Sequence, residues 1–272
     1  MRIAAVASLA LAAGCQTYAQ QQVALVPHAT GMLTDGQPLD HVAQLGFGAS
    51  NVFDPVAPTA SAANGDYVPG TQLRADLALR LGKHAALWFA GEDGFASSAH
   101  SVSATLPFIN SGADVLGGGA GLTVFVPTSI PRFKVALSSE VIFWNVPWVQ
   151  YSTCTVGCNG LGITTADQGT TLVPTLAVDV TPSYRIGAFT VFAGVTLRNQ
   201  PTVPAADTTD VADSADIQAG AFNVTLHGGL SYLVADAFKV MLSLQQTITS
   251  DPIAYGPSVA FMVRIPLGAR SP

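Results

Sequence analysis

Eight charged side chains lie in segments where apolar and polar residues alternate. They are Arg74, Asp76, Arg80, Lys134, Glu140, Asp179, Lys239 and Arg264. In a strand, this alternation places a charge on the face opposite the apolar residues. If the strands enclose a narrow lumen and these charges face it, each charge needs a partner. The set then predicts either a network of ion pairs that fills the lumen or a narrow polar pore that prefers anions.

Four aspartates recur at every third position in one polar segment: Asp207, Asp210, Asp213 and Asp216. Carboxylates can bind calcium, but this spacing lacks the central glycine and the terminal glutamate of a calcium-binding loop. A solvated acidic loop is the favoured interpretation. We therefore expect no metal site and no cofactor.

The histidines are scattered at positions 28, 41, 84, 100 and 227. His100 has serines as neighbours, but the sequence contains no Gly-x-Ser-x-Gly nucleophile motif. The glycine-rich run 117–121 lies within an alternating segment with no helix after it, whereas a phosphate-binding loop needs that helix. These glycines are expected to relieve crowding in a strand wall. The sequence thus predicts a protein that is not an enzyme.

The charged residues belong to ten alternating segments of period two, which indicates strands. The segments cover about 42–53, 70–81, 84–92, 113–126, 132–146, 170–181, 186–198, 221–234, 237–249 and 255–267. Tight gaps at 82–83, 127–131, 182–185 and 235–236 alternate with long gaps at 54–69, 93–112, 147–169 and 199–220. The last gap, 250–254, is shorter but falls in the position of a long one. Short turns that alternate with long loops are typical of an up-and-down transmembrane β-barrel. Eight or twelve strands remain open.

A soluble β-sandwich also alternates, but the strands here are long and their polar faces are rich in small residues. Charged residues make up 10% of the chain and the mean hydropathy is +0.40. No apolar stretch of about 18 residues follows the N-terminus, which excludes a helical span. A closed barrel is the other structure that satisfies every backbone group in lipid.

Aromatic residues gather toward strand ends, as they do in membrane-interface belts. Phe125, Phe133, Tyr184, Phe189, Tyr232 and Phe238 lie toward the tight gaps, and Phe53, Trp88, Phe89, Phe143, Trp144, Trp148, Phe222 and Tyr255 toward the long ones. Packing on strands without a membrane is the alternative.

Residues 1–19 have the pattern of a signal peptide. Cleavage after Ala19 and a lipobox ending at Cys15 both remain open. Cys154 and Cys158 lie in one long gap, and a disulfide is expected between them after export. Residues 20–41 are expected to form a periplasmic lead-in, 42–267 the barrel and 268–272 a tail. The net charge of −6, without a basic stripe, argues against nucleic-acid binding.

Over about residues 42–267 the chain resembles small bacterial outer-membrane β-barrel proteins. The family carries an assembly signal in its last strand, and Gly256, Val259 and Phe261 match its spacing. The family usually ends on an aromatic residue, whereas this chain continues to Pro272. The resemblance implies an outer-membrane location and two kinds of partner, outer-membrane lipid and the assembly machinery.

The sequence thus predicts an all-β, up-and-down outer-membrane barrel with a largely plugged lumen and a structural or surface-interaction role. A narrow pore, a secreted β-sandwich and an outer-membrane enzyme are the alternatives. Both chain ends are expected on the periplasmic side, and any ligand, whose identity stays open, on the external loops 147–169 and 199–220.

Overall fold

The computed structural model describes residues 17–28, 30–53, 65–95, 113–156, 164–202, 217–234, 237–248 and 257–270. Its strands are β1 (Thr17–Leu25), β2 (His41–Val52), β3 (Gly65–Tyr67), β4 (Thr71–Arg80), β5 (Ala85–Gly94), β6 (Val115–Val126), β7 (Phe133–Val156), β8 (Thr164–Ile186), β9 (Phe189–Thr202), β10 (Gln218–Val234), β11 (Phe238–Ile248) and β12 (Ser258–Arg270). Among these residues, no helix is long and apolar enough to cross a membrane.

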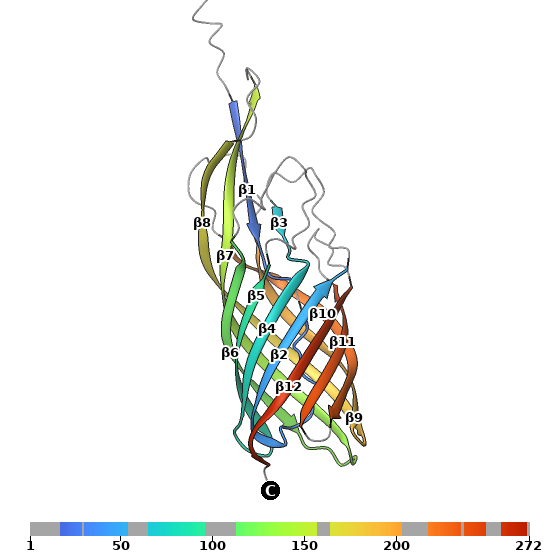
Figure 1. Cartoon of the computed structure of the whole chain (residues 1–272). Helices are drawn as coiled ribbons and strands as arrows, with labels where there is room; N and C mark the ends of the chain where they lie inside the picture. Colours follow the sequence, from blue (N-terminus) through green and yellow to red (C-terminus); the bar gives the residue numbers. More distant parts are fainter. Residues whose placement is uncertain are drawn as a thin grey trace, which may run out of the picture.

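All of these strands except β1 and β3 close into an antiparallel ring, in the order β2, β4, β5, β6, β7, β8, β9, β10, β11 and β12 (Figure 1). The ring closes because β12 pairs with β2 while β7 pairs with β8. Apart from the closing pair β12 and β2, neighbours in the ring are also neighbours in sequence, once β3 is set aside. The predicted ten-stranded, up-and-down barrel is confirmed.

One tight turn lies further along the chain than predicted. The sequence placed it at residues 182–185, but β8 continues to Ile186 and the turn is formed by Gly187 and Ala188. Gly187 has φ +61°, a left-handed conformation that costs glycine little. Pro182 remains in β8 opposite Val135, at a point where the β8–β9 register has no partner for it.

Two strands extend far beyond the barrel on the side of the long connections (Figure 1). β7 has 24 residues and β8 has 23, so most of the predicted loop 147–169 is a paired ribbon. β1 joins the ribbon beside β7, from Thr17 opposite Val156 to Ala24 opposite Trp148. The prediction of an irregular loop was wrong here because a third strand supports the ribbon. The predicted loop 199–220 is likewise strand at both edges, since β9 ends at Thr202 and β10 begins at Gln218.

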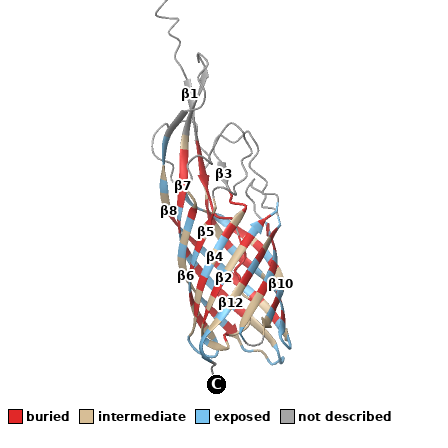
Figure 2. Cartoon of the chain, in the orientation of Figure 1, coloured by how far each residue is buried: buried red, intermediate tan, exposed pale blue. Residues whose placement is uncertain are grey.

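The two faces of the wall differ as the alternation predicted (Figure 2). Apolar side chains such as Phe47, Leu137 and Leu242 face outward and are exposed, whereas the inward positions are buried. Tyr184, Phe189 and Tyr232 are exposed near the tight turns, and the rings of Phe189 and Tyr232 lie 4.6 Å apart. The outer face is therefore apolar, with aromatics at its tight-turn edge.

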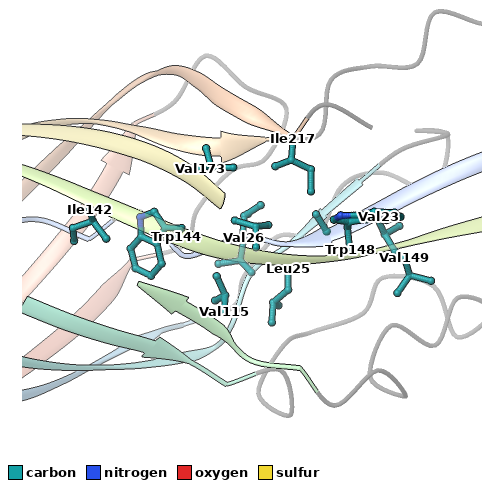
Figure 3. Close-up of a cluster of buried hydrophobic side chains, with 13 residues drawn as sticks. Val23, Leu25, Val26, Val115, Ile142, Trp144, Trp148, Val149, Val173 and Ile217 are labelled. Carbon is teal, nitrogen blue, oxygen red and sulfur yellow. The ribbon is translucent and has the colours of Figure 1, made fainter. Parts of the chain in front are cut away.

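Four aromatics predicted for the outer belts lie inside. Phe125, Trp88, Trp144 and Trp148 are all buried, while their neighbours Phe89 and Phe143 are exposed. Period two puts adjacent residues on opposite faces, so only one of each pair can face lipid. Trp144 and Trp148 join a buried apolar cluster with Val23, Leu25 and Val26, where β1 meets the barrel mouth (Figure 3).

Candidate functional site in the barrel lumen

Residues 26–28 and 30–39, here called the lumen segment, run along the inside of the barrel. They connect β1, at the end with the long connections, to β2, which begins at the tight-turn end. Val26, Met32, Leu33 and Leu39 of this segment are buried. These residues were expected to belong to a periplasmic lead-in over 20–41, but the structure places them inside the barrel.

The first and last described strands lie at opposite ends of the barrel, whereas both chain ends were expected on one side. β1 lies beside the ribbon at one end of the barrel, whereas Arg270 of β12 is opposite His41 at the other end (Figure 1). The lumen segment crosses the barrel between β1 and β2, so β1 and the end of β12 lie on opposite sides.

Small inward residues make room for the lumen segment. Met32 and Leu39 pack in a buried cluster with Ala78, Ala86, Ala90, Trp88, Phe125, Ala136 and Ala177. Leu33 packs in another cluster with Phe192, Met241, Ala260 and Met262. Several inward positions of the wall are alanine, so the segment occupies volume that larger side chains fill in a narrower barrel.

The backbone of the lumen segment is bonded to side chains of the wall. Gly31 N donates to Gln245 Oε1 at 2.9 Å, and Met32 N donates to Thr196 Oγ1 at 3.2 Å. Gln200 Nε2 donates to Pro27 O and Arg264 Nη2 to Leu33 O, each at 2.7 Å. A buried backbone group without a partner is costly, so these bonds allow an extended segment to lie in the lumen.

One carboxylate of the lumen segment is paired with the wall. Asp35 Oδ2 lies 2.8 Å from Lys239 Nζ and also accepts a hydrogen bond from Ser231 Oγ at 2.8 Å. The side chains of Asp35 and Lys239 are 3% and 13% exposed. This pair of a buried carboxylate and a half-buried ammonium fixes the part of the segment nearest the tight turns.

A network of ion-paired arginines and carboxylates joins strands of the wall across the lumen. Arg74 pairs with Glu92 and, at 3.0 Å, with Glu140, which also pairs with Arg198. Arg74 further lies 3.7 Å from Asp76 and stacks 4.8 Å from the centre of the Trp88 ring. The shared carboxylate of Glu140 links β4, β7 and β9 across the lumen.

A second buried group centres on Asp179. His227 Nε2 lies 2.7 Å from Asp179 Oδ2, Thr196 Oγ1 donates to the same oxygen at 2.6 Å, and Thr181 donates to Oδ1. A Cβ added to Gly31 of the lumen segment would lie 3.0 Å from the His227 ring. The pair is therefore covered by the lumen segment.

The structure brings together six of the eight predicted lumen charges or pairs them with others. Arg74, Asp76, Glu140 and Arg264 share one network, since Arg264 lies 3.6 Å from Asp76. Lys239 pairs with Asp35, and Asp179 with His227. Arg80 donates only to Gly82 O, and Lys134 has no ion pair within the described residues. Both lie at the tight-turn mouth.

The sequence reasoning missed three members of these networks. Arg198 lies on the polar face of its strand, and Glu92 at the predicted end of its strand, so the alternation contained a signal for both. Asp35 lies outside any alternating segment. No local pattern indicates that it enters the lumen.

A small cavity remains between the lumen segment and the wall. It has a volume of about 30 Å³ and is lined by residues that include Thr34, Arg74, Asp76, Ser138 and Arg264. Two polar atoms of its lining, Arg74 Nε and Asp76 Oδ1, are buried without a hydrogen-bond partner in the protein. A polar cavity of this size holds about two water molecules.

Other predicted sites lie outside the described residues. These are Cys15, Cys158, His100 and the aspartates 207–216, and the side chain of Cys154 is likewise not described. Within the described ranges, no three histidine, cysteine or carboxylate side chains form a group that could hold a metal ion.

No family model matches the sequence, and no curated protein is detectably similar to it. Among solved structures, the translocator domain of autotransporter NalP from Neisseria meningitidis is similar at 7% identity over 83% of this chain and 88% of that one, with a TM-score of 0.42. LpxR from Salmonella typhimurium is similar at 14% identity over 82% of this chain and all of that one, with a TM-score of 0.41.

The Ralstonia pickettii toluene transporter TbuX is similar at 9% identity over 87% of this chain and 92% of that one, with a TM-score of 0.37. These low identities and scores assign no activity to the chain. With its closed antiparallel ring of ten strands, apolar outer face and polar lumen, the chain is an up-and-down β-barrel.

Proposed function

We propose that this protein is an outer-membrane β-barrel whose lumen is closed by its own residues, and that its role is structural or lies in surface interaction. The occupied lumen carries the proposal. The lumen segment fills the interior together with the ion-pair networks, and the cavity beside it has room for about two water molecules.

The outer surface supports placement in a membrane. Large apolar side chains are exposed on successive strands of the ring, including Phe47, Leu73, Leu137, Leu197 and Phe261. In water, a patch of this extent would be an association hazard, whereas in lipid it is the favourable surface. Every strand of the ring pairs on both sides, which leaves the wall without an open edge in the bilayer.

The surface role would belong to the ribbon of β7, β8 and β1. Elements that project from a rigid barrel can contact other molecules without disturbing the wall. β1 is connected to the lumen segment, so the ribbon and the closure of the lumen form one continuous stretch of chain.

No catalytic role is part of this proposal. The buried pair His227 and Asp179 is the described group that most resembles part of a catalytic set, and Gly31 of the lumen segment covers it. A substrate could reach it only if the segment moved.

Recording from planar bilayers tests the closed lumen. The purified, folded protein should give no stable single-channel steps. A variant in which residues 26–39 are replaced by a glycine–serine linker of equal length keeps β1 and removes the packing, and it should conduct. Steps from the unmodified protein would overturn the closed-lumen proposal in favour of a narrow pore.

Fractionation of cells tests the location separately. The protein should sediment with the outer membrane and migrate differently in gel electrophoresis before and after heating. A freely soluble exported product would contradict a membrane barrel.

A further inference from the structure

The rim of the barrel at the tight turns carries basic side chains on two adjacent hairpins. Arg80, Lys83 and His84 lie at the β4–β5 turn, and Arg132 and Lys134 at the β6–β7 turn. The hairpins contact each other, because Phe125 N donates to His84 O at 2.8 Å. Neither 78–91 nor 117–139 contains an acidic residue. All charged side chains near these two turns are therefore positive.

Three of these side chains are available to a ligand. Lys83, His84 and Arg132 are exposed, and none of them forms an ion pair within the described part of the chain. Arg185, another cation of the rim, does have an acidic partner, because its guanidinium lies 3.8 Å from the carboxylate of Asp40. The positive charge of the two hairpins is thus not neutralised by neighbouring side chains.

The depth of these residues matches lipid headgroups. Phe133 is opposite Tyr184, one of the exposed aromatics near the tight turns, and Arg185 N donates to Arg132 O at 2.9 Å. Arg132 is thus one residue, about 3.3 Å, beyond the aromatic edge that marks a membrane interface. Leu81 and Ile130, in the same turns, are 61% and 56% exposed. Apolar and basic residues side by side at this depth can contact acyl chains and phosphate at once.

The backbone at Arg132 gives an independent reason to regard this position as functional. Arg132 has φ +68° and is the non-glycine residue with positive φ in the described part of the chain. A glycine would adopt this conformation at lower cost, as Gly187 does in the β8–β9 turn. Strained residues of this kind cluster at binding sites.

From these observations we infer that the β4–β5 and β6–β7 turns bind the phosphate headgroup of an anionic phospholipid, with Lys83 and Arg132 as its main contacts. The inference rests on the proposed membrane location. Each cation near an anionic membrane surface contributes enough to change binding about fivefold.

The test compares vesicles of phosphatidylcholine alone with vesicles that also contain phosphatidylglycerol. The full-length protein is folded into both, and the phospholipid retained after mild detergent extraction is identified by native mass spectrometry. The unmodified protein should enrich phosphatidylglycerol. Combined Lys83→Gln and Arg132→Gln should reduce that enrichment about 25-fold, whereas Lys83→Arg with Arg132→Lys should retain it because both charges stay.

Equal enrichment by the glutamine variant would overturn the site. The absence of enrichment in the unmodified protein would also overturn it. If the two turns bound an acidic peptide and no phospholipid, the site would belong to a protein partner. Folding in phosphatidylcholine alone reports on the barrel itself, so failure of the lipid site remains distinguishable from failure of the proposed function.

Discussion

The buried carboxylate of Asp35 and the half-buried ammonium of Lys239 form an ion pair, 2.8 Å apart, between the lumen segment and β11. The two residues are far apart in sequence, and the pair attaches the segment to the wall of the barrel. Removing one partner of this pair tests whether the contact stabilises the folded protein.

Replacing Lys239 by Ala should lower the free energy of unfolding by about 3 to 5 kcal/mol, because a buried carboxylate would lose its cation. Urea titration in phospholipid vesicles, followed by tryptophan fluorescence, measures this. The double exchange Asp35→Lys with Lys239→Asp restores opposite charges and should recover part of the loss. If the exchanged protein is no more stable than Lys239→Ala, the pair does not stabilise the lumen segment.

Glu140 should be among the most sensitive positions of the wall. Glu140→Ala leaves Arg198 without its carboxylate and removes one of the partners of Arg74, so a loss of about 3 to 5 kcal/mol is expected. The matched control is Ser139→Ala, one residue away on the exposed face, which should change stability by less than about 0.5 kcal/mol. Similar losses from both variants would show that the network does not determine the effect.

Gly194 is predicted to tolerate no side chain. An added Cβ would lie 2.5 Å from His227 Nε2 and 2.7 Å from Val180 O. Gly194→Val should therefore lower the free energy of unfolding by about 1 to 3 kcal/mol through overpacking. Gly91→Ala is the control, because the nearest atom to its added Cβ is 4.0 Å away. Thermal unfolding of the two variants separates the cases. A stable Gly194→Val would mean that His227 can leave its place beside Asp179.

Labelling of single cysteines in cells tests the orientation of the barrel. In a background without Cys15, Cys154 and Cys158, a cysteine at exposed Gln168 in the ribbon should react with a membrane-impermeant maleimide in intact cells. A cysteine at exposed Ser129 in a tight turn should react only after the outer membrane is breached, because short turns face the periplasm in such barrels. The opposite pattern would reverse the orientation.

The alternation of side chains alone determined the wall of this protein. It predicted the ten strands of the ring, the apolar outer face and the inward positions of Arg74, Glu140 and Asp179, because a strand exposes successive residues to opposite sides. The glycines at 117 and 121 were also predictable as places of crowding. In the structure they lie against the rings of Trp144 and Trp88.

Only the tertiary structure decided what fills the lumen. Residues 26–39 have no strand periodicity, and their partners, among them Thr196, Gln245 and Lys239, come from strands far along the chain. The same holds for the ribbon, where β1 pairs with β7 across more than a hundred residues of sequence. Local patterns report the environment of a side chain within its own strand. The path of a segment through the space enclosed by ten others depends on the volume and hydrogen bonds that the closed ring leaves free.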